Sequence, residues 1–210
     1  MAHPYNKIYL SDAMENLADA FDTAASVYKF QLDYFLKLFI ISGIAVQFEI
    51  GNPKYVSGKS GAELVADVVS KTNASKVIMP KPIYKEPTEE YWTGWVLAYY
   101  QWCTNKRFRD IQNIITMEEL KSKYHPYHEM DEEKIVDYID MKKDASATVR
   151  RLQAYRKALG LSQSQLAKES GINLRTLQQY EIGAKELNKA SASTVLALSK
   201  TLKCDIEDLI

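Results

Sequence analysis

The sequence predicts an all-α protein with two helical domains. Apolar residues recur at spacings of three and four, alternation of apolar and polar residues is scarce, and several helix-capping patterns are visible. With 210 residues and 46% apolar composition, the chain is long enough to build two cores. We expect an N-terminal helical domain over residues 1–144 and a smaller helical domain over residues 145–210.

Capping residues and loop residues define the expected elements of the N-terminal domain. Ser11 or Asp12 is a candidate cap for the first helix, and Ser60 with Glu63 forms a capping box. Thr116 with Glu119 caps a short helix in the same way. Further helices are expected over 32–48 (one or two), 89–109 and 131–141, with loops at 51–58 and 73–87, a turn at 125–130 and a hinge at 142–147.

The predicted helix over 89–109 carries all three tryptophans. Trp92, Trp95, Tyr99 and Trp102 are spaced by three, four and three residues, so they form one stripe. A stripe of this kind usually belongs to a hydrophobic core. It also provides candidate partner-binding residues, because tryptophan and tyrosine are enriched at interface hot spots.

Two short helices joined by a tight turn are predicted over residues 161–180. Ser162 and Gln165 form a capping box, Gly171 ends the first helix, and Asn173 caps the second. Leu177 is expected on the buried side of the second helix. Its outward residues include arginine and glutamine, which make paired hydrogen bonds to base edges in the major groove. The candidate DNA-binding residues are Ser162, Gln163, Asn173, Leu174, Arg175, Thr176, Gln178 and Gln179.

From about Val149 to Leu209, the chain resembles the Cro/C1-type (XRE) helix-turn-helix family. The resemblance implies a five-helix, lambda-repressor-like domain, with helices near 146–159, 162–169, 173–181, 191–202 and 205–209. At the start of the helix near 162–169, Gln163 is expected to contact a phosphate with its amide and backbone N–H. The resemblance further implies that Arg156 pairs with Glu181. This pair is expected to orient helices rather than to read DNA.

A second resemblance concerns the N-terminal region. The segment from Ser42 to Val56, SGIAVQFEIGNPKYV, looks like a pattern that recurs ahead of Cro/C1-type domains in bacterial proteins. Those proteins resemble regulators encoded near toxin genes. The resemblance implies an antitoxin-like regulator.

The two expected domains differ in net charge. Residues 145–210 hold 10 Lys/Arg and 6 Asp/Glu, a net charge of +4, whereas residues 1–144 hold 17 and 21, a net charge of −4. Phosphate binding requires local positive charge. Because +4 is modest, we expect a homodimer on a palindromic double-stranded DNA operator.

Other functions find little support in the sequence. Ser57-Gly-Lys-Ser60 lacks the first glycine of a phosphate loop, because Pro53 stands there. His125 and His128 around a proline are a poor metal ligand set. We therefore expect no catalytic residue, cofactor or metal. Two lone cysteines and the lack of a signal peptide or membrane span indicate the bacterial cytoplasm.

Two hypotheses follow for the whole chain. In the first, it is an antitoxin that neutralises a toxin through its N-terminal domain and represses its own operon. In the second, it is a phage-type or metabolic repressor whose N-terminal domain dimerises or senses a small ligand.

Overall fold

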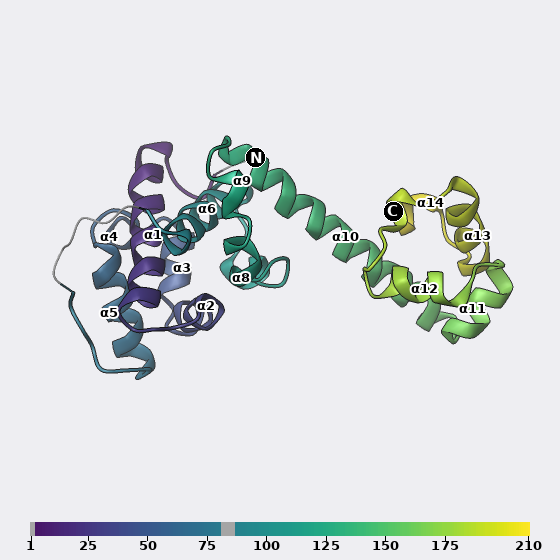
Figure 1. Ribbon diagram of the computed structural model, residues 1–210, viewed down its shortest axis with the longest axis horizontal. Helices are drawn as coiled ribbons and strands as arrows, with labels where there is room; N and C mark the ends of the chain where they lie inside the picture. The colour runs from purple at the N-terminus through teal and green to yellow at the C-terminus, as the bar shows by residue number, and fades with distance from the viewer. Residues whose placement is uncertain (1–2, 81–86) are drawn as a thin grey trace. The chain divides into compact units, whose positions relative to one another are not determined.

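The computed structural model describes residues 3–80 and 87–210, and it is all-α (Figure 1). Within these residues no strand occurs, which confirms the predicted fold class. The chain divides into two compact units, Met1–Asp137 and Tyr138–Ile210. No helix among the described residues is long and apolar enough to cross a membrane. The 81–86 part of the predicted 73–87 loop lies outside the described residues.

Helix α1 (Leu10–Ser26) is the central helix of the N-terminal unit, and it packs against α5 (Gly61–Thr72) and α6 (Glu89–Thr104). Its buried face includes Leu17 and Phe21, both fully buried. The approach of α6 depends on Gly94, since a Cβ there would lie 2.5 Å from the Leu17 carbonyl oxygen. Gly61 allows the same close approach of α5.

Short helices complete this unit, and some of them meet in an aromatic cluster. They are η1 (Lys7–Tyr9), α2 (Leu32–Ile41), α3 (Ile44–Glu49), α4 (Pro53–Val56), α7 (Phe108–Ile111), α8 (Met117–Lys121) and α9 (Tyr124–Tyr127). The rings of Phe39, Phe48 and Phe108 meet edge to face, with centroids 5.3–6.1 Å apart. Two distant carboxylates satisfy the first backbone N–H groups of α7 and α8. Glu49 accepts from Phe108 at 2.7 Å, and Asp33 accepts from Met117 at 2.8 Å.

Most capping predictions for this unit are confirmed. Ser60 and Glu63 form the reciprocal capping box of α5, and Thr116 caps α8. The predicted start of α1 at Ser11 or Asp12 is wrong, because the helix already begins at Leu10 after η1. The first part of the turn expected at 125–130 belongs to α9, which begins at Tyr124. The short helices α4 and α7 were not expected.

Helix α10 (Glu132–Ala158) corrects a second prediction. Residues 142–147 were expected to be a hinge, but they are helical and belong to this 27-residue helix. The stretch contains lysine, alanine and serine and lacks glycine and proline, so nothing in it ends a helix. Its polarity alone led to the wrong interpretation. The boundary between the compact units falls within α10, after Asp137.

The C-terminal unit has the five predicted helices. After the end of α10 come α11 (Gln163–Ser170), α12 (Leu174–Glu181), α13 (Ala192–Leu202) and α14 (Ile206–Leu209), with a 3-10 turn, η2 (Leu187–Lys189), between α12 and α13. Each of them contributes to one core. Leu152, Leu166, Leu177, Leu198 and Leu209 are fully buried there.

Candidate DNA-binding site

The turn between α11 and α12 has the local chemistry that its sequence predicts. Ser162 Oγ accepts from the Gln165 N–H at 3.2 Å, and the Gln165 side chain accepts from the Ser162 N–H at 2.8 Å. Gly171 adopts a left-handed conformation (φ 68°), which ends α11. Asn173 Oδ1 accepts from the backbone of Arg175 and Thr176 and thereby starts α12. The box therefore starts α11, and Gly171 and Asn173 together set the turn between the two helices.

One face of α12 is buried and the opposite face is polar and open. Leu177 and Tyr180 are buried against the core of the unit. Leu174, Arg175 and Gln178 are exposed, whereas Thr176 and Gln179 are partly buried. The candidate base-reading residues therefore lie on the outer side of the helix, where a DNA groove can reach them.

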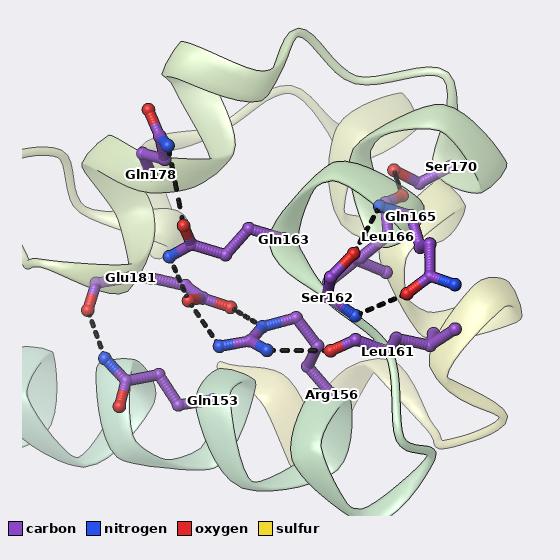
Figure 2. Close-up of polar contacts among 10 residues, drawn as sticks. All are labelled: Gln153, Arg156, Leu161, Ser162, Gln163, Gln165, Leu166, Ser170, Gln178 and Glu181. Atoms are coloured by element: carbon purple, nitrogen blue, oxygen red, sulfur yellow. Dashed lines mark hydrogen bonds and ion pairs between the residues drawn. The ribbon is translucent and has the colours of Figure 1, made fainter.

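Glu181, the last residue of α12, is the centre of a buried hydrogen-bond network (Figure 2). Its side chain is only 1% exposed and lies against Arg156, whose side chain is 11% exposed. Arg156 donates to the two carboxylate oxygens from Nε at 2.5 Å and from Nη2 at 2.9 Å. These hydrogen bonds raise the pKa of Arg156 above its ordinary value. The structure thus contains the Arg156–Glu181 pair that the family resemblance implied.

The network also includes Gln153 of α10 and the loop residue Leu161, neither of which was expected in it. Gln153 donates to the backbone carbonyl of Glu181 at 2.6 Å, and Arg156 Nη1 donates to the carbonyl of Leu161 at 2.8 Å. Helix α12 is therefore tied at its end to α10 by Gln153 and, through Gln163, to α11 (Figure 2). Sequence patterns gave no signal for Gln153, because it partners a backbone atom 28 residues away.

Gln163, expected to contact a phosphate, belongs to this network in the structure. Its Nε2 donates to Glu181 Oε2 at 2.7 Å, and its Oε1 lies 3.5 Å from Gln178 Nε2. An amide nitrogen has two hydrogens, so one donor of Gln163 is not used by Glu181. The side chain is partly exposed and its amide is oriented by a charged partner.

Comparison with known families agrees with this geometry. Residues 152–209 match the helix-turn-helix family model. They form a Cro/C1-type helix-turn-helix DNA-binding domain. The protein is accordingly a DNA-binding transcriptional regulator, and its target is double-stranded DNA. No curated protein and no solved structure matches the chain significantly.

The aromatic stripe on α6 divides into a buried and an accessible part. Trp102 is 7% exposed, donates to the carbonyl of Tyr5 at 3.0 Å and stacks on His3. It is a core residue, so it is unsuited to the partner-binding role that we considered for it. Trp92, Trp95 and Tyr99 are partly buried and keep accessible surface.

Trp92 and Trp95 line a pocket of about 700 Å³ inside the N-terminal unit. The Trp95 indole donates to Glu132 at 3.2 Å, and the Trp92 ring meets Tyr124 edge to face at 5.7 Å. Residues 125–130 were expected only as a turn. No sequence pattern indicates this pocket, because the turn and α6 are separated by more than 20 residues and meet only in the folded unit.

Proposed function

We propose that the chain is an antitoxin, which neutralises a protein toxin through its N-terminal region and represses its own operon through its DNA-binding domain. In this proposal residues 1–144 bind the partner or dimerise, and residues 145–210 bind DNA. The chain acts by binding rather than by catalysis, in the cytoplasm of a bacterium.

Accessible aromatic side chains on α6 are the observation that carries the partner-binding part. Trp92, Trp95 and Tyr99 leave part of their large rings open on one helix. Rings of this kind anchor protein interfaces, because they bury much area at little entropic cost. The net charge of −4 in residues 1–144 favours a basic partner.

Repression through a homodimer is the second part of the proposal. The exposed face of α12 is short, and the domain carries a net charge of only +4, so one copy offers few phosphate contacts. Two copies on a palindrome would contact half-sites about 34–36 Å apart. Footprinting should show two symmetrical half-sites, and affinity should fall steeply with salt. One unsymmetrical site, or affinity independent of salt, would contradict the dimer.

Co-purification tests the toxin. The chain, expressed from its native operon, should retain one stoichiometric partner, and Trp95→Ala should lose it while still binding the operator. Tyr34→Ala is a matched control, since Tyr34 is an aromatic residue that is 45% exposed on a different helix, α2. If the native operon yields no partner, the antitoxin proposal is wrong.

The alternative is a phage-type or metabolic repressor whose N-terminal region senses a small ligand or only dimerises. The pocket beside α6 favours sensing over simple dimerisation, because its volume is in the range of ligand-binding sites. A ligand that changes operator affinity, in a chain with no protein partner, would support this alternative.

A further inference from the structure

We propose that the pocket beside α6 is a binding site for a small organic cation that carries an alkylated ammonium group. This inference does not depend on the antitoxin role, because it concerns only the residues of the N-terminal unit that line the pocket. Its basis is the combination of aromatic walls with carboxylates.

Aromatic rings from two parts of the chain form the walls. Tyr91, Trp92 and Trp95 belong to α6, whereas Tyr124 and Tyr127 belong to α9. Tyr91 stacks on Trp95 with ring centroids 6.3 Å apart. A cation is attracted to the face of such rings, and tryptophan is the strongest of them. Several rings around one cavity are the usual arrangement for recognition of quaternary ammonium groups.

Two carboxylates give the pocket its charge. Glu132 is held at the wall by the Trp95 indole, and Glu15 reaches it from α1. Among the described residues that line the pocket, none is a lysine or arginine, and the one basic side chain, His128, stacks on Tyr124 with ring centroids 4.2 Å apart. The pKa of Tyr91 is raised, first by burial and then by the negative charges of Asp19 and Glu15. The field beside the rings is therefore negative and favours a cation over a neutral or anionic ligand.

The aromatic walls of the pocket favour an organic cation over a small inorganic ion. Within the described residues, no group of three histidine, cysteine or acidic side chains is arranged to hold a metal ion. Aromatic faces cannot replace the hydration shell of a small inorganic ion, but an alkylated ammonium group is weakly hydrated and loses little on entering. A cavity of about 700 Å³ also exceeds what a bare ion needs and accommodates an organic body.

Choline and its neutral carbon isostere, 3,3-dimethylbutan-1-ol, form a matched pair of probes for calorimetry on the full chain. Choline should bind with one site per chain and at least about tenfold more tightly than the isostere, since a desolvated cation–aromatic contact contributes enough for this difference. In the NMR spectrum the indole N–H of Trp95 should shift, while that of Trp102, bound to Tyr5, should not.

Variants of the two carboxylates test whether the preference for choline arises in this pocket. The double variant Glu15→Gln/Glu132→Gln should lose most of the preference for choline and keep its weak binding of the isostere. Glu133→Gln is the control, because Glu133 is exposed on the same helix but does not line the pocket. Equal binding of both probes, no heat from choline at about 20 mM, or an unchanged preference in the double variant would each overturn the proposal.

Discussion

Replacement of Glu181 by alanine tests whether the buried network holds α12 in place. Glu181→Ala removes an acceptor that is 1% exposed and receives three hydrogen bonds, two from Arg156 and one from Gln163. Arg156 would then be a buried charge without its partner. Loss of one member of a buried ion pair costs about 3–5 kcal/mol. We expect this loss in the free energy of unfolding of the C-terminal unit.

Hydrogen exchange followed by mass spectrometry measures this loss in the full chain, because it resolves the two units separately. Amides of α11 and α12 should lose protection by roughly a hundredfold to a few thousandfold, at about 1.36 kcal/mol for each tenfold change. Amides of α1 and α6 should be unchanged. A two-state melting curve is not needed, which matters for a chain of two units.

Two variants give this prediction its controls. Glu186→Ala removes an exposed carboxylate that pairs with Lys189 at 3.0 Å, and it should cost no more than about 0.5 kcal/mol. Arg156→Met/Glu181→Leu leaves no unpaired charge, so it should be more stable than Glu181→Ala by about 1 kcal/mol or more. If Glu181→Ala behaves like Glu186→Ala, the network does not stabilise the domain and the reasoning is refuted.

Three further predictions concern single contacts. Arg175→Ala should relax base preference at one operator position by about 1–3 kcal/mol, measured by binding to a set of operator variants; a uniform loss over all sequences would show that Arg175 contacts a phosphate. Ser162→Ala should cost about 1 kcal/mol of stability because it removes the capping box of α11, whereas Ser162→Gly should cost only a few tenths, as chemical denaturation can show. Gly94→Ala should destabilise the N-terminal unit by about 1–3 kcal/mol, because its Cβ would lie 2.5 Å from the Leu17 carbonyl. The opposite sign, a gain from better helix propensity, would show that α1 and α6 adjust freely.

Sequence patterns were most reliable where structure depends on local chemistry. The caps at Ser60, Thr116, Ser162 and Asn173 involve residues two or three positions apart, and all four occur in the structure. The five helices of the DNA-binding domain were implied by the family resemblance, which also placed Glu181 opposite Arg156.

Features that depend on distant contacts were missed. Helix α7 begins where Glu49, 59 residues away, accepts from the Phe108 N–H, and no local pattern predicts that bond. Polarity around Lys142 was interpreted as a hinge because composition alone does not distinguish an exposed helix from a linker. The spacing of the α6 stripe was correct, but spacing does not determine that Trp102 is buried while Trp95 stays accessible.

The position of the tryptophans has an optical consequence. All three lie on α6, and the unit Tyr138–Ile210 contains tyrosine but no tryptophan. Indole fluorescence excited near its red edge therefore comes from the N-terminal unit alone, and two of its three emitters line the pocket. The domain on which operator DNA docks therefore contains no indole that could respond directly to the DNA. Any change of indole emission on addition of DNA would measure communication from the DNA-binding domain to the N-terminal unit without a label.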